Sequence, residues 1–352
     1  MSRTGRLRSA LLVAMVAIVA VVALSAGAAY VHAQAPGSPP NPFKTIESYF
    51  KLPEGRTIGS TPAIDIDRDG SSVWVFERCG ASACAGSSLA PLIKFDSSGK
   101  VVKAIGAGMF IYPHGIYMDR DGSVWVTDGR AATPEELQKF PDAKGKGHAV
   151  VKLSPEGKVL MTLGKAGVAG DGPDTFNQPT DIIIAPNGNI FVSDGHGGDS
   201  NARIVKFTKD GKFIKTWGKK GSGPGEFDTP HSLAFDSRGR LFVADRGNNR
   251  IQIFDQDGTF LDVWKQFGRP SGIVIDKNDT LYAADSQSNE KVNPGFRPGI
   301  YIGSAKDGKV TAFILDPTTP IASQEGVAVD AKGNIYGSLT SGMALKKYVK
   351  GS

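Results

Sequence analysis

The sequence predicts an all-β protein, a six-bladed β-propeller preceded by an export signal. Three observations support this prediction. One hairpin-forming unit recurs six times after residue 61, glycine and proline make up 65 of 352 residues, and helix-forming segments are nearly absent. This composition favours a turn-rich fold, and the lack of a fixed glycine triplet excludes collagen. With 40% hydrophobic and 22% charged residues, the chain can bury a sizeable core.

Residues 1–33 have the pattern of a secretory signal peptide. Three arginines precede an uncharged apolar stretch (residues 11–24), and small residues then lead to Ala33. This order of basic, apolar and small residues is typical of a cleaved signal. An uncleaved membrane anchor is the alternative, because the uncharged stretch continues to Ala29 and nearly reaches the length of a membrane span. Both readings place the rest of the chain outside the cytoplasm, secreted or periplasmic.

Residues 34–43 (QAPGSPPNPF) are expected to form a proline-rich linker, so the propeller should occupy residues 44–352. Beyond the signal the chain holds 38 basic and 35 acidic side chains. This small excess of positive charge is too weak to indicate nucleic acid as a partner. Contact with a membrane is expected only if the N-terminal segment stays uncleaved.

Each repeat contains an alternating hydrophobic strand, a short turn and a second strand that usually ends in an acid. The copies begin at Pro62, His114, Thr180, His231, Ser271 and Glu325. Alternation around an Asp-Gly or Asn-Gly turn is a strong hairpin signal. Further strands are expected between the copies, as in residues 148–164 and 202–218, so each unit has the four strands of a propeller blade. An open stack of hairpins is disfavoured because it exposes two sheet edges. The one expected helix covers residues 133–140.

We take the first strand of each repeat as the innermost, so that it lines the central channel. The opening residues of these strands then form a ring, and its metal-binding members come from alternate blades: His114, His231 and Glu325. Alternate blades lie about 120° apart by symmetry, so the three side chains should converge on the axis. Two imidazoles and a carboxylate with an open position suit a catalytic zinc ion or non-haem iron(II). The alternative is that these residues bind no metal: the histidines would end their strands with a structural hydrogen bond, and Glu325 would be solvated.

In a hairpin the start of the first strand and the end of the second lie at the same end. Arg78, His196 and Arg246 follow second strands and should therefore point toward the ring. Arginine can clamp a carboxylate with two hydrogen bonds, and histidine can act as a general base near neutral pH. Inter-blade ion pairs and a surface position for His196 are the alternatives. Hydrogen bonds between blades are expected for the acids that end second strands, Glu77, Asp128, Asp194, Asp245 and Asp285.

Cys79 and Cys84 are the only cysteines and lie five residues apart in one loop. In an oxidising compartment such a pair is expected to form a disulfide. A metal site is less favoured, because one cysteine pair supplies too few ligands.

Residues 217–255 (WGKKGSGPGEFDTPHSLAFDSRGRLFVADRGNNRIQIFD) closely resemble an NHL repeat. The stretches YPHGIYMDRDGSVWVTDG, FNQPTDIIIAPNGNIFVSDGHGGDSNARIVKF and TPHSLAFDSRGRLFVADRGNNRIQIF resemble the peptidyl-α-hydroxyglycine α-amidating lyase family, whose fold is a six-bladed propeller. The similarity runs through most of residues 60–350.

The resemblance implies a zinc ion on three channel histidines. His114 and His231 match two of them, and Glu325 stands at the third. Arg78 and Arg246 match functional arginines of the family, and the place of its catalytic tyrosine is taken by His196. Where the family has the aspartate of a structural calcium site this chain has Gly326, which leaves calcium doubtful.

The leading hypothesis is a metal-dependent lyase that cleaves the C–N bond of a carbinolamide, R-CO-NH-CH(OH)-COO⁻, into an amide and glyoxylate. Arg78 would bind the carboxylate, the metal would acidify the hydroxyl, His196 would take its proton and Arg246 would stabilise charge. One alternative is a metal-dependent hydrolase or lactonase for a small carboxylated substrate. The other is a non-catalytic exported propeller that binds a peptide, glycan or protein partner.

Overall fold

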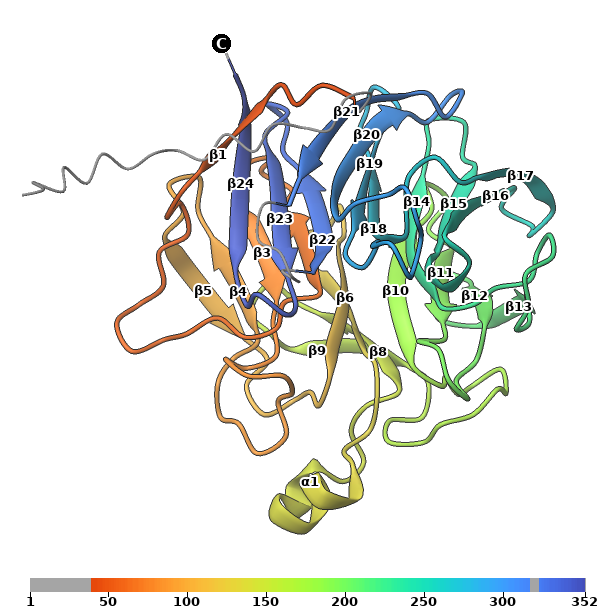
Figure 1. Cartoon of the computed structure of the whole chain (residues 1–352). Coiled ribbons are helices and arrows are strands. Elements are labelled where there is room, and N and C mark those ends of the chain that lie inside the picture. The colour runs from red at the N-terminus through yellow and green to blue at the C-terminus, as the bar shows by residue number, and fades with distance from the viewer. Residues whose placement is uncertain (1–38, 317–322, 352) are drawn as a thin grey trace, which may run out of the picture. The chain divides into compact units, whose positions relative to one another are not determined.

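Six four-stranded antiparallel sheets, each one propeller blade, make up the computed structural model, which describes residues 39–316 and 323–351 (Figure 1). The predicted all-β six-bladed fold is confirmed. The predicted signal, residues 1–33, lies outside the described residues. Within the described ranges no helix has the length and apolar character needed to cross a membrane.

The first three blades follow one another along the chain. Blade one contains β2 (Ala63–Ile66), β3 (Val73–Phe76), β4 (Leu92–Phe95) and β5 (Val101–Ile105). Blade two contains β6 (Pro113–Met118), β7 (Val124–Asp128), β8 (Ala149–Leu153) and β9 (Val159–Leu163). Blade three contains β10 (Pro179–Ile184), β11 (Ile190–Asp194), β12 (Arg203–Phe207) and β13 (Phe213–Trp217).

The remaining blades complete the ring. Blade four contains β14 (Pro230–Phe235), β15 (Leu241–Asp245), β16 (Arg250–Phe254) and β17 (Phe260–Trp264). Blade five contains β18 (Pro270–Ile275), β19 (Thr280–Asp285), β20 (Gly299–Ser304) and β21 (Val310–Leu315). Blade six contains β22 (Gln324–Val329), β23 (Ile335–Leu339), β24 (Leu345–Lys350) and the N-terminal β1 (Phe43–Ile46).

The ring closes through both ends of the chain. Strand β1 pairs antiparallel with β24, with Phe43 opposite Lys350, so the sixth sheet combines the N-terminal and C-terminal strands (Figure 1). This pairing covers a sheet edge that would otherwise stay exposed. It also corrects the predicted linker 34–43, because Phe43 already belongs to the propeller and the Pro42 carbonyl accepts a hydrogen bond from the Gly351 amide.

The hydrophobic core lies between the faces of adjacent blades. For example, Trp125 and Val150 of blade two pack with Ile182 and Val192 of blade three. Sheets that pack face to face interdigitate the side chains of their alternating strands. The period-two pattern of the repeats therefore specifies the inter-blade packing as well as the hairpins.

The long insertion of blade two carries the expected helix, α1 (Pro134–Lys139), which begins with a capping box formed by Thr133 and Glu136. Two short 3-10 helices, η1 (Pro141–Ala143) and η2 (Arg246–Asn248), complete the regular structure of the described residues.

The acids that end the second strands are hydrogen-bonded within their own blades. Asp194 accepts from the Arg203 guanidinium of β12 and from the Asn177 amide just before β10, each at 2.9 Å, and Asp245 accepts from the Arg250 guanidinium of β16 at 2.7 Å. Buried carboxylates need such partners. The arginine and backbone hydrogen bonds expected for these acids are present, but these bonds join strands and connections of one blade and do not run between blades.

Candidate metal centre and anion-binding channel

Bulges in the innermost strands direct the ring residues toward the axis. In blade four the register shifts between Pro230 and Ser232, which leaves His231 outside the ladder. Blade six shifts in the same way around Glu325, and blade two shifts between Pro113 and Ile116, around His114. A bulge adds an unpaired residue and re-aims its side chain. The repeated irregularity therefore builds a ring of inward-facing side chains at one level of the channel.

Each ring histidine is oriented by the next blade. His114 Nδ1 lies 2.8 Å from the Thr180 carbonyl oxygen, and His231 Nδ1 lies 2.9 Å from that of Ser271. A carbonyl only accepts, so each ring carries its proton on Nδ1 and leaves Nε2 with a free lone pair. Both Nε2 atoms are buried and have no hydrogen-bond partner among the described residues.

Four ligand-bearing side chains meet at this point. One ligand atom of each of His114, His196, His231 and Glu325 lies within 4.8 Å of all the others. Glu325 Oε1 is 3.8 Å from His114 Nε2 and 3.6 Å from His231 Nε2. The structure thus brings together all three predicted ligands and adds His196, for which sequence analysis predicted the role of a base.

The donor set fits a divalent metal. Burial, followed by the positive charge of Arg78, lowers the pKa of His114 to about 3, and burial holds the pKa of His231 and of His196 well below the ordinary value. The imidazoles are therefore neutral at physiological pH, as ligands must be. Buried nitrogens without a partner beside a carboxylate are the environment expected of a zinc or iron(II) site.

The two predicted arginines flank the cluster. Arg78 and Arg246 are each only 6% exposed. The Arg246 guanidinium lies 3.9 Å from Glu325 and donates to His196 Nε2 at 3.2 Å, while its Nε has no partner. Arg78 donates to the Pro113 carbonyl and to Ser60 Oγ. No carboxylate of the described residues comes within ion-pair distance of Arg78. Of these two buried guanidiniums only Arg246 has a carboxylate within ion-pair distance, and this excess of positive charge favours the binding of an anion.

Sequence analysis missed three residues near the site. Tyr112 lies between two arginines, with Arg78 Cζ 3.6 Å and Arg130 Cζ 4.7 Å from its ring centroid. Arg130 in turn pairs with Glu136 of α1. Thr340 donates to Glu325 Oε2 at 3.3 Å. The alignment of the repeats could have indicated Thr340, because it occupies in blade six the position that Arg78 and Arg246 occupy in theirs.

Two cavities meet at the cluster. A channel cavity of about 500 Å³ is lined by the innermost strands, including His114, His231 and Glu325. A smaller cavity of about 90 Å³ is lined by His114, His196, Tyr112 and Arg130. His114 lines both cavities, so one of the predicted ligands is also in contact with the cavity that carries Tyr112 and Arg130.

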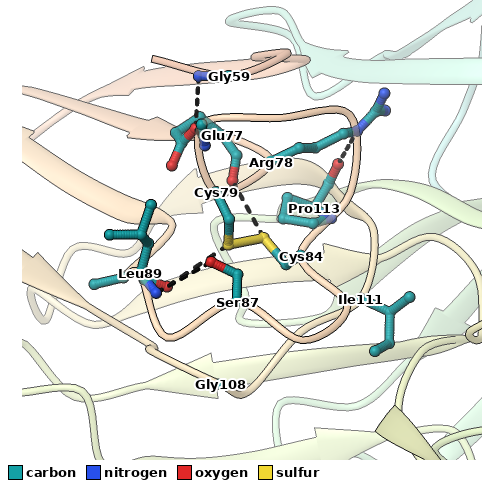
Figure 2. The surroundings of a disulfide bond; sticks show 12 residues. Gly59, Glu77, Arg78, Cys79, Cys84, Ser87, Leu89, Gly108, Ile111 and Pro113 are labelled. Atoms are coloured by element: carbon teal, nitrogen blue, oxygen red, sulfur yellow. Dashed lines mark hydrogen bonds between the residues drawn. A yellow bond between two sulfur atoms is a disulfide. The ribbon is translucent and has the colours of Figure 1, made fainter. Parts of the chain in front are cut away.

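The loop that follows Arg78 is closed by a disulfide between Cys79 and Cys84 (Figure 2). The Cys84 amide donates to the Ile111 carbonyl of the segment leading to His114. Figure 2 shows Arg78 leaving this loop and reaching Pro113. The disulfide loop therefore ties the first predicted arginine to the strand that carries the first predicted ligand.

Replacing Cys79 and Cys84 together by alanine should lower the free energy of unfolding by about 2 kcal/mol, because the closed loop is short and restricts the unfolded chain only modestly. Urea denaturation of the variant and of the parent protein measures this loss. Reductant should lower the midpoint of the parent to that of the variant and leave the variant unchanged. Equal midpoints of the two oxidised proteins would contradict the prediction.

Asp128 should make stability depend on pH. It is 2% exposed, and burial raises its pKa to about 6 although the Tyr112 and Ile111 amides donate to it. A raised folded pKa gives stability that is complete below the unfolded value of about 3.8 and is lost as the pH rises through 6. We expect the Asp128→Asn variant to lose less unfolding free energy than the parent between pH 4 and pH 7. Parallel slopes in urea denaturation would argue against this assignment.

A family model for the NHL repeat matches residues 227–254, which include β14, β15 and β16. Peptidyl-glycine alpha-amidating monooxygenase B of Xenopus laevis is 36% identical over 231 residues, 60% of this chain and 24% of that protein. A probable peptidyl-alpha-hydroxyglycine alpha-amidating lyase of Caenorhabditis elegans is 37% identical over 158 residues, 44% of this chain and 40% of that protein. The chain thus spans about a quarter of the length of the amidating monooxygenase it matches.

Solved structures share the fold at low identity. A gluconolactonase of Xanthomonas campestris aligns with a TM-score of 0.58 at 15% identity, over 90% of this chain and 98% of that one. At such identity the likeness concerns the fold alone. Together with the repeat match and the sequence relatives, it supports one conclusion: this chain is a six-bladed β-propeller with one segment that matches the NHL repeat, and it resembles the peptidyl-α-hydroxyglycine α-amidating lyases.

Proposed function

We propose that the protein is a metal-dependent lyase that cleaves a carbinolamide, R-CO-NH-CH(OH)-COO⁻, into an amide and glyoxylate. One observation carries the proposal: three imidazoles and a carboxylate converge on one point of the channel, with two buried arginines beside them. The relatives in sequence, which include a probable alpha-amidating lyase, favour this reaction over others that a propeller could host.

His114, His231 and Glu325 would hold the metal, zinc or iron. When bound there, such an ion supplies Lewis acidity, which lowers the pKa of a hydroxyl beside it. Thr340 and Arg246 hold the second oxygen of Glu325, so Oε1 is the one presented to the two imidazoles. These contacts orient the ligand set before any substrate arrives.

Arg78 would bind the substrate carboxylate. Its guanidinium is fixed by the Pro113 carbonyl and by Ser60, and it stacks on Tyr112, so little conformational freedom is lost on binding. A preorganised guanidinium binds a carboxylate more tightly than a flexible one would. With the carboxylate on Arg78, the carbinol carbon would lie toward the ring of imidazoles.

His196 would take the proton of the carbinol hydroxyl. Its Nε2 accepts from Arg246, so this nitrogen bears no proton of its own, and it would act as the base once Arg246 turns from it to the substrate oxygen. As the hydroxyl oxygen forms the carbonyl of glyoxylate, the C–N bond breaks and its electron pair passes to nitrogen. That nitrogen then takes the proton held by His196, which completes the amide and returns the imidazole to its neutral form. The Arg246 charge would stabilise the oxygen while it is negative.

The test is incubation of the purified protein with an N-acyl-α-hydroxyglycine and zinc near pH 7. Equal amounts of glyoxylate and primary amide are expected, each measured by mass spectrometry. The His114→Ala, His231→Ala double variant is the matched control for spontaneous breakdown. Release of glyoxylate no faster than in that control would reject the lyase. Tight binding without release would favour the binding-module alternative.

Export from the cytoplasm belongs to the same proposal. The Cys79–Cys84 disulfide supports it, because structural disulfides persist in oxidising compartments. Fractionation of the producing cells, followed by mass measurement of the mature protein, tests both the compartment and cleavage after Ala33. Recovery in the cytoplasmic fraction would contradict it.

A further inference from the structure

We propose that His196 is a fourth ligand of the channel metal, and that Arg246 competes with the metal for its Nε2 atom. This inference rests on the metal site of the proposed function. It adds a ligand from a blade that contributes no metal-binding residue to the predicted ring, and it gives Arg246 a second role, as a positioning residue.

The three imidazoles have the spacing of a shared metal ion. Ring centroids are 4.7 Å apart for His114 and His231, 4.8 Å for His114 and His196, and 5.2 Å for His196 and His231. Nitrogens that bind zinc tetrahedrally at their usual bond length place their ring centroids about 5 Å apart. A histidine that served as a base alone would not need to complete this near-equilateral triangle.

The Glu325 carboxylate lies at a distance from the imidazoles that suits the same metal ion. Ligand atoms of a tetrahedral zinc site are about 3.4 Å from one another, and Glu325 Oε1 lies 3.8 Å and 3.6 Å from the Nε2 atoms of His114 and His231. All four donors fit within 4.8 Å. The set is therefore compact enough to bind one shared ion.

His196 is held differently from the other two imidazoles. His114 and His231 sit in strand bulges and are fixed through Nδ1. His196 lies in a loop after β11, between Gly195 and Gly197, both at positive φ, and its amide donates to Ser200. A glycine-flanked loop lets the ring move further than a strand would. His196 is thus the ligand best able to exchange.

Arg246 occupies the atom that the metal would need. Its guanidinium always donates, so at 3.2 Å it holds the lone pair of His196 Nε2. One nitrogen cannot serve both partners. With His196 on the metal the four protein donors close the shell, as in structural sites. With His196 on Arg246 one position stays open, as in catalytic sites. Competition by Arg246 therefore shifts the equilibrium toward the open form without preventing the closed one.

The first test measures zinc affinity of the full-length protein by competition with a chromogenic chelator, without substrate. We expect His196→Ala to lower the affinity by at least about 100-fold, since even outer-shell changes cost about 10- to 100-fold. His231→Ala serves as the reference for loss of a ligand. His148→Asn is the matched control, because His148 is buried outside the cluster and its positive φ suits asparagine.

The second test is a double-mutant cycle with Arg246→Ala. Removal of the guanidinium should raise zinc affinity, and this gain should shrink in the His196→Ala background, where no imidazole is freed. Circular dichroism checks that each variant is folded, and His196→Asn replaces the alanine variant if it is not. A parent protein that binds no zinc would reject the metal site of the proposed function. A parent that binds zinc as tightly as His196→Ala, or equal gains in the two backgrounds, would reject only the role given to His196.

Discussion

Replacing His114 and His231 together by alanine is expected to abolish stoichiometric metal binding and to lower kcat/KM for the carbinolamide by at least about 1,000-fold. A bound metal contributes several kcal/mol of charge stabilisation in a transition state, and loss of two imidazoles leaves only Glu325 and His196 of the cluster. Metal content after dialysis and the rate of glyoxylate release measure the two effects. If this variant turned over the carbinolamide at the rate of the parent protein, His114 and His231 would not belong to the catalytic metal site.

Folding of that double variant provides the control. Both Nε2 atoms are buried without a partner, so the removal of these two atoms leaves no other group unpaired. The bonds that Nδ1 makes to the Thr180 and Ser271 carbonyls are lost, and a modest decrease of the unfolding free energy is expected. His148→Asn should retain zinc and turnover. A variant that binds no metal because it is unfolded would be recognised by circular dichroism.

Local patterns predict the blades well because each hairpin is encoded by contiguous residues. The alternation and Gly-containing turn of HGIYMDRDGSVWVTDG specify β6 and β7 without reference to the rest of the chain. Alignment of such copies also locates the ring, because equivalent residues of a closed repeat lie at one level. The meeting of His114, His231 and Glu325 could therefore be predicted from their repeat positions alone.

Contacts between distant segments could not be predicted in this way. Strand β1 is a four-residue segment with an unremarkable sequence, and its pairing with β24 depends on where the chain ends meet. Hairpin geometry predicts that His196 points toward the ring, but its direct contact with the His114 imidazole depends on the course of a glycine-containing loop, which has no periodic pattern. Tyr112 stacks on Arg78 across two blades. Each of these contacts depends on tertiary packing, which local sequence preferences do not predict.

The Arg78→Ala variant should lower kcat/KM for the carboxylated substrate by about 100- to 1,000-fold, the loss typical of removing a preorganised charge-stabilising donor. The expected effect is on substrate recognition, because Arg78 has no ion-pair partner among the described residues and is aligned by Pro113, Ser60 and Tyr112. Arg78→Lys should recover little activity, since a lysine cannot reproduce the two parallel hydrogen bonds of a guanidinium.

A substrate analogue separates recognition from folding. If Arg78 binds the carboxylate, an analogue carrying a primary carboxamide in its place should be turned over poorly, and at nearly equal rates by the parent and by Arg78→Ala. Arg130→Ala, which removes the arginine on the other side of Tyr112, should cost less for the carboxylated substrate, because Glu136 already neutralises Arg130. If Arg78→Ala lowered the rates for both compounds by the same factor, Arg78 would be acting through the structure of the channel and the carboxylate would bind elsewhere.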